Sequence, residues 1–203
     1  MQNSEPDRRP SRLAELPRRL RLVFGARDSG LQDDPAGEQL ETPLTDFVAY
    51  ATDCLVSGAL ARPVGRMSDL LNAHEGYELV NVQLQSLADG HVVSVPLVSL
   101  ARDEIIAVHA AGPPSPRGRR TNLRAYPVVI RSEPYRIWGY LHSLPGADPL
   151  ASFRHRRPMV PLTHASIEYA LAGRPDRFHL GTLIVNRDLA ESLELTADED
   201  VQR

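Results

Sequence analysis

Two clusters of arginine are the side chains of this chain whose type and spacing could do chemistry. They are Arg117, Arg119 and Arg120, and Arg154, Arg156 and Arg157. Guanidinium groups form paired hydrogen bonds with carboxylates and phosphates, so these clusters could bind a polyanion or an acidic protein. Both clusters fall within residues 110–160, which carry nine Arg and only two acidic residues. Solvated loops, or loops that dock on the acidic residues 28–53, are the simpler interpretation.

Other chemistry-bearing residues form no recognised catalytic or cofactor motif. No two of the seven His residues have the i, i+4 spacing of a helical metal site, and the chain has no Cys-x-x-Cys, no Gly-x-Ser-x-Gly and no Gly-rich phosphate loop. Four His residues lie in the C-terminal half and could converge: His142, His155, His164 and His179. Histidines at strand ends are more often surface residues. We therefore expect no metal and no cofactor, and an enzyme is the less favoured class.

Composition places the chain among globular proteins. It has 203 residues, of which 42% are hydrophobic and 24% are charged. All 23 basic residues are Arg, which a genome that favours Arg codons would explain. Cys54 is the only cysteine, so no internal disulfide can form and a reducing, cytoplasmic location is expected. No apolar run reaches the roughly 20 residues that span a bilayer.

The elements that must position these side chains are strands. From Tyr135 to Leu141 successive residues alternate between two faces, which is the period of a half-buried strand. The stretch Cys54–Leu60 has the same spacing, with Gly58 in the place of Gly139. Trp138 lies on the face opposite Ile137, so we expect that both faces of this strand are covered. We therefore predict a mainly β protein built from two tandem small β-barrel or half-sandwich modules with short helical turns.

Composition shifts give the expected boundaries. The predicted segments are a flexible arm (1–42) with a possible short helix (11–24), β module one (43–110), a Pro- and Gly-rich linker (111–121), β module two (122–193) and an acidic tail (194–203). A module of about 65 residues buries only about 60% of its unfolded surface. We therefore expect the two modules to pack together or to pair across a homodimer.

The best match between the halves lies near their ends. Val93–Asp103 aligns without a gap on Phe178–Asp188, and Pro96 predicts that its strand is an edge strand or carries a bulge. Beyond Asp188 the match degrades. Residues 189–193 are predicted to be helical rather than extended, and the acidic tail to be mobile.

The pattern of Gly-x-Leu, a Pro/Gly loop, Arg66-x-Ser-Asp69-x-Leu-Asn72 and two strands ending in Arg102-Asp resembles a small β module of uncharacterised bacterial proteins. No activity comes with that resemblance. The second copy, with Asp148-Pro-Leu, lacks the Ser-Asp pair and the Asn. The resemblance therefore implies that only Arg66, Asp69, Asn72 and Arg102 could form a binding loop.

The same residues are similar, more distantly, to Sm-like small barrels. Gly58, Asp69 to Asn72 and Arg102 occur in the order in which that family places the loops that hold an RNA base. The spacing from Gly58 to Asp69 is longer than in that family, and Asp103 stands where the family has Gly. The resemblance implies RNA binding in the first module.

These observations favour a non-enzymatic assembly or adaptor protein that binds protein partners through strand edges and is itself a homo-oligomer. A nucleic-acid-binding protein that uses the Arg-rich loops is the alternative, and an enzyme of unknown class comes third.

Overall fold

The computed structural model describes residues 44–62, 64–110 and 122–202. Eleven strands and a few short helices make up most of these residues. The first half (residues 44–110) contains β1 (Thr45–Ala51), β2 (Cys54–Leu60), α1 (Met67–Ala73), β3 (Gly76–Ser86), β4 (Val92–Ala101), the 3-10 turn η1 (Arg102–Glu104) and β5 (Ile105–His109). The second half (residues 122–202) contains β6 (Arg124–Ser132), β7 (Tyr135–Ser143), α2 (Pro149–Arg154), β8 (Met159–Leu171), β9 (Arg174–His179), β10 (Thr182–Asn186), η3 (Arg187–Leu189), β11 (Ser192–Leu195) and α3 (Asp198–Gln202). The prediction of a mainly β protein is confirmed.

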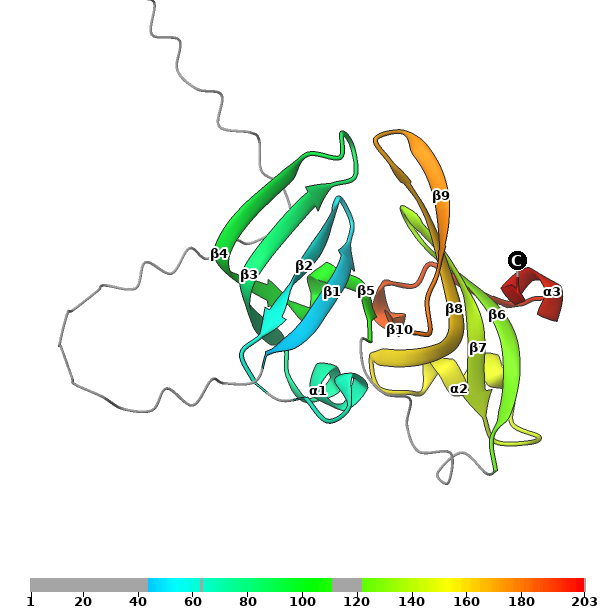
Figure 1. Cartoon of the computed structure of the whole chain (residues 1–203). Coiled ribbons are helices and arrows are strands. Elements are labelled where there is room, and N and C mark those ends of the chain that lie inside the picture. The colour runs from blue at the N-terminus through cyan, green and yellow to red at the C-terminus, as the bar shows by residue number, and fades with distance from the viewer. Residues whose placement is uncertain (1–43, 63, 111–121, 203) are drawn as a thin grey trace, which may run out of the picture.

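All these strands belong to one antiparallel sheet. Its order is β11-β6-β7-β8-β10-β5-β1-β2-β3-β4, and β9 pairs with the C-terminal part of β8. Figure 1 shows two lobes, with β5 of one and β10 of the other meeting between them. Among the described residues this strand path ends at β4 and at β11, and β9 is a further edge strand beside β8. Because the pairing is continuous, the tandem-barrel form of the prediction stays a prediction.

Cross-strand registers recur between the halves. Phe47 lies opposite Gly58 in β1 and β2, and Val128 lies opposite Gly139 in β6 and β7. On its other side each glycine faces a register shift, where two residues of the next strand oppose one. The extra residues are Asn81 and His164, whose φ angles are 53° and 48°. Each is the left-handed residue of a β-bulge, which bends and twists the strand.

The two glycines are required by close packing rather than by their backbone angles. A Cβ on Gly58 would lie 3.0 Å from Val82 Cγ2 and 3.1 Å from Val80 O. A Cβ on Gly139 would lie 3.0 Å from Leu162 Cβ. A side chain at either position would therefore force neighbouring atoms to move, where β2 faces the bulge of β3 and where β7 faces the bulge of β8.

The halves share a hydrophobic core. Tyr50, Ile106 and Ala107 of the first half lie in the same buried cluster as Ile137 and many other residues of the second half. Rings of Tyr50 and Tyr135 meet edge to face at 5.6 Å, and Tyr135 Oη donates a 2.6 Å hydrogen bond to Ala51 O. The expectation that the halves pack together is met within one chain.

The C-terminal residues differ from the sequence-based expectation. Residues 192–195 form β11 rather than a helix, because the register continues past Asp188: Leu193 pairs with Ile130 as Val108 pairs with Ala49. Residues 198–202 form α3, which buries Val201, so the tail is packed rather than mobile. Phe178–Asp188, which aligns with Val93–Asp103, is not one continuous strand, because β9 ends at His179 and β10 begins at Thr182. Pro96 lies, as predicted, in an edge strand, β4.

The predicted N-terminal arm at 1–42, with its possible helix at 11–24, and the linker at 111–121 lie outside the described residues. Within the described ranges no helix is long and apolar enough to cross a membrane.

Candidate functional site

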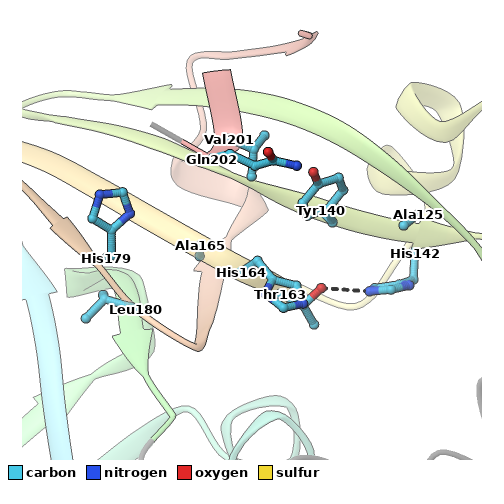
Figure 2. A pocket seen from close by; sticks show the side chains of 10 residues that line it. All are labelled: Ala125, Tyr140, His142, Thr163, His164, Ala165, His179, Leu180, Val201 and Gln202. Carbon is cyan, nitrogen blue, oxygen red and sulfur yellow. Dashed lines mark hydrogen bonds between the residues drawn. The ribbon is translucent and has the colours of Figure 1, made fainter. Parts of the chain in front are cut away.

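A pocket of about 600 Å³ opens on the second half, between β7, β8, the end of β9 and α3. Figure 2 shows Tyr140, His142 and Thr163 along one stretch, His179 and Leu180 at the other end, and two residues of α3 above them. Ten residues line this pocket: Ala125, Tyr140, His142, Thr163, His164, Ala165, His179, Leu180, Val201 and Gln202. We call it the histidine pocket.

Three of the four histidines singled out in the sequence meet here, each for a separate structural reason. His142 follows the alternation of β7, and its Nε2 lies 2.8 Å from Thr163 Oγ1. His164 is the bulge residue of β8, and its ring meets that of Tyr140 edge to face at 6.0 Å. His179 ends β9, and its Nδ1 lies 3.0 Å from Ser166 Oγ. His155, the fourth, is exposed at the end of α2 and does not line the pocket.

The chemistry of this pocket is that of hydrogen-bonding side chains and ring edges. None of the described residues that line it carries a carboxylate. In the described ranges no three His, Cys, Asp or Glu side chains are arranged to hold a metal ion. The first half has Asn81 in place of His164 and Ser94 in place of His179, as the strand registers show. The histidine pocket therefore belongs to the second half alone.

Trp138 lies close to this pocket, on the outer face of β7. Its ring is only 5% exposed and packs with Val129 and Val201, which confirms that the second face of the strand is covered. The guanidinium of Arg177 lies 3.9 Å from the ring centroid, and that of Arg136 lies 4.9 Å from it. The cover thus consists of α3 and two arginines, and Trp138 lies outside the core that the halves share.

The polar residues of the first half are placed in different settings. Arg66 precedes α1, and Arg66 and Asp69 are exposed. Arg102 donates through Nη1 to His74 O at 3.3 Å, and its Nη2 lies 3.7 Å from Glu75 Oε1. Asn72 instead binds the backbone of Met159 in the second half. Arg102 thus joins η1 to the residues after α1, whereas Asn72 is engaged by the second half of the chain.

The second arginine cluster is not one continuous cationic surface. Arg154 and Arg157 are exposed, whereas Arg156 is partly buried and donates to His142 O. Burial lowers the pKa of Arg156. The first cluster, Arg117, Arg119 and Arg120, lies outside the described residues.

The two ends of the sheet are the remaining candidate. Backbone groups of β4 and β11 that face away from β3 and β6 have no partner strand among the described residues. Ala101 N–H, at the end of β4, donates to the side chain of Glu104 instead of to a strand. Such edges are the usual places where a further strand is added.

No protein-family model, no curated protein and no solved structure matches this chain.

Sequence reasoning missed Tyr140, Thr163 and Gln202 as pocket residues. Tyr140 and His142 lie on the same face of β7 as Trp138, so the alternation of the sequence already grouped these three side chains. Nothing in the sequence indicated that α3 would close the pocket with Gln202.

Proposed function

We propose that this protein is a non-enzymatic, cytoplasmic assembly protein that binds protein partners through the strand edges of two copies of one β module. The observation that carries the proposal is the junction between the halves. There β10 pairs with β5 in antiparallel register, with Leu183 opposite His109 and Val185 opposite Ala107. Leu183, Ile184 and Val185 are all at most 1% exposed. The fold thus already joins one strand edge to another by strand addition.

Recurring registers support an internal duplication. The pairs around Gly58 and Gly139 correspond, and so do the pairs of the later strands: Leu79 with Val98 in β3 and β4, and Leu162 with Leu183 in β8 and β10. On this correspondence β10 is the counterpart of β4, and β11 is the counterpart of β5. The strands that pair inside the chain are β10 and β5. The unpaired ends, β4 and β11, are the counterparts of those two strands.

Proline substitutions at outward-facing amides test the proposal. Ala110 N–H donates to Thr182 O, so Thr182 and Ile184 direct their backbone groups to β5. The corresponding residue of β4 is Ser99. On β11, Thr196 N–H donates to Pro127 O, so by alternation Leu195 N–H faces away from β6. Ser99→Pro and Leu195→Pro therefore block one edge each without removing a bond of the sheet.

We expect at least one of these variants to lose the proteins that co-purify with the wild-type chain from its native cell. Leu144→Ser is the matched control, because Leu144 is an exposed apolar residue of a turn away from both edges. Circular dichroism and thermal unfolding establish that each variant is folded. Unchanged co-purification with both edges blocked would remove the proposal. Self-association stays a prediction and is measured on the same samples by light scattering.

A nucleic-acid-binding protein is the second candidate, supported by the exposed guanidiniums of Arg154 and Arg157. Phosphate contacts would make polyanion affinity fall steeply between about 50 and 200 mM salt. No shift with any oligonucleotide at low salt would exclude this candidate.

A further inference from the structure

A small groove lies beside the free edge of β11. It has a volume of about 140 Å³ and is formed by α2, η3 and β11. Its lining residues are Leu150, Phe153, Arg154, Arg187, Ala190, Glu191, Ser192 and Leu193. We call it the α2–β11 groove.

The corresponding place in the first half, beside α1 and β5, is filled by the second half. Met159 and Ile184 are each 1% exposed and belong to the hydrophobic cluster that contains Leu71 and Ile105. Ile184 lies opposite Val108 in the β10–β5 pairing. The internal junction therefore combines strand pairing with two apolar side chains that enter the neighbouring half.

Polar groups fix that junction. Asn186 Nδ2 donates to Arg102 O at 3.0 Å and to Ile105 O at 3.1 Å. Arg102 O also accepts the N–H of Ile105. Beside β11 the same turn recurs, because Arg187 O accepts the N–H of Ala190 at 3.2 Å. The carbonyls of Arg187 and Ala190 therefore lie beside the free edge of β11. They correspond to the carbonyls of Arg102 and Ile105, which accept from Asn186.

Register and hydrogen-bond direction make the two edges equivalent. Leu193 of β11 corresponds to Val108 of β5. Leu193 pairs with Ile130, which lies two residues after Val128, the partner of Gly139. Val108 pairs with Ala49, which lies two residues after Phe47, the partner of Gly58. Ala110 N–H donates to β10, so Val108 N–H faces the same way. At β11 the N–H groups of Leu193 and Leu195 face outward by the same alternation. Arg154 follows the buried Phe153 in α2 as Asn72 follows the buried Leu71 in α1.

A second copy of this chain could offer the free edge of β4, and β4 lacks the side chains that this edge requires. Its free β4 offers Ser99 where β10 has Ile184, and Ala101 where β10 has Asn186. The residue of β3 that corresponds to Met159 is Gly76, because Gly76 pairs with Ala101 as Met159 pairs with Asn186. Serine, alanine and glycine would leave the groove empty and would bring no side-chain donor to the carbonyls of Arg187 and Ala190.

We propose that the α2–β11 groove binds an extended segment of a different protein, antiparallel to β11, with a branched aliphatic residue followed two positions later by asparagine. The aliphatic side chain enters the groove at the place that corresponds to Ile184, and the asparagine amide donates to Arg187 O and Ala190 O. Arg154, whose guanidinium only donates, binds a carbonyl or carboxylate of the same partner. This proposal rests on the assembly function and names the partner chemistry of one of its two edges.

The chain supplies its own probe. A synthetic peptide with the sequence of residues 181–187 (Gly-Thr-Leu-Ile-Val-Asn-Arg) carries both required side chains, and a peptide with residues 96–102 (Pro-Leu-Val-Ser-Leu-Ala-Arg) carries neither. We expect saturable binding of the first peptide to the full chain, measured by fluorescence polarisation, and at least tenfold weaker binding of the second. Ile184→Ser and Asn186→Ala in the first peptide should each weaken binding.

Two variants of the protein locate the binding. Leu195→Pro and Arg154→Glu should each lower the affinity for the 181–187 peptide about tenfold or more, while Arg157→Glu, an exposed neighbour outside the groove, should not. Ser99→Pro, on the opposite edge, should leave the affinity unchanged. Equal binding of both peptides, or none at all, overturns the proposal. Concentration-dependent self-association abolished by Leu195→Pro would also overturn it, because a second copy would then occupy the edge.

The result also separates the two proposals. If Ser99→Pro alone abolishes partner co-purification and the 181–187 peptide does not bind, the assembly function stands and the groove proposal falls. If neither edge variant affects co-purification, the assembly function falls as well.

Discussion

Asn72 binds both backbone groups of Met159: its Oδ1 accepts from Met159 N–H at 3.0 Å, and its Nδ2 donates to Met159 O at 2.8 Å. Nδ2 also donates to Ser68 O at 2.8 Å, which ties the side chain to its own helix. One amide from α1 thus fixes the first residue of β8, in the other half of the chain.

Removing that amide should loosen the connection between the halves. Asn72→Ala leaves two backbone groups of Met159 without these partners, and we expect a loss of about 1–3 kcal/mol in the free energy of unfolding. Chemical denaturation measures it. Asn122→Ala, at an exposed position, is the control and should change stability little. Equal stability of the two variants would show that the Asn72 contacts add nothing.

The bulge glycines should tolerate no side chain. Gly139→Ala places a methyl group 3.0 Å from Leu162 Cβ, and Gly58→Ala places one 3.0 Å from Val82 Cγ2. Overpacking of this kind costs about 1–3 kcal/mol, which thermal or chemical unfolding would detect. Gly65→Ala is the matched control, since a Cβ there meets nothing within 4 Å. A neutral effect at Gly139 would mean that β7 and β8 shift easily.

Stability should fall in alkaline solution. Burial raises the pKa of Tyr50 and Tyr77 from 10.0 to about 12, and that of Cys54 from 9.0 to about 12. The unfolded chain therefore releases these protons at a lower pH than the folded chain does. The contribution of these groups is complete below about pH 9 and is lost as the pH rises toward about 12. Urea titrations at a series of pH values test this, and a constant midpoint up to about pH 10.5 would contradict it.

Trp138 provides an optical test of the cover over β7, because it is the only tryptophan of the chain. Arg177→Ala removes the cation–π contact at 3.9 Å and the 2.6 Å hydrogen bond from Arg177 Nη2 to Asp200 O in α3. We expect a red shift of the tryptophan emission and a loss of up to about 2 kcal/mol. Arg174→Ala, an exposed arginine of the same strand, should leave the emission unchanged. Matching spectra for both variants would rule out Arg177 as part of the cover.

Local patterns predicted much of the secondary structure. Alternation predicted the strand through Tyr135 and Leu141, and the matching spacing at Cys54–Leu60 predicted its counterpart. The start of α2 also has a local cause, because the Asp148 carboxylate accepts the Leu150 N–H at 2.9 Å. The prediction of a helix at 189–193 was wrong beyond Leu189, which ends the 3-10 turn η3. These residues have no clear period of their own, and the strand at 192–195 exists because β6 offers it a register.

The sequence by itself determined which residues alternate, where the chain turns and that Gly58 and Gly139 hold matching positions, because these depend on neighbours along the chain. The tertiary structure alone decided which edges meet. The pairing of β10 with β5, the hold of Asn72 on Met159 and the histidine pocket under α3 all join residues far apart in sequence. Such contacts depend on how strands are ordered in the sheet, and no local spacing records that order.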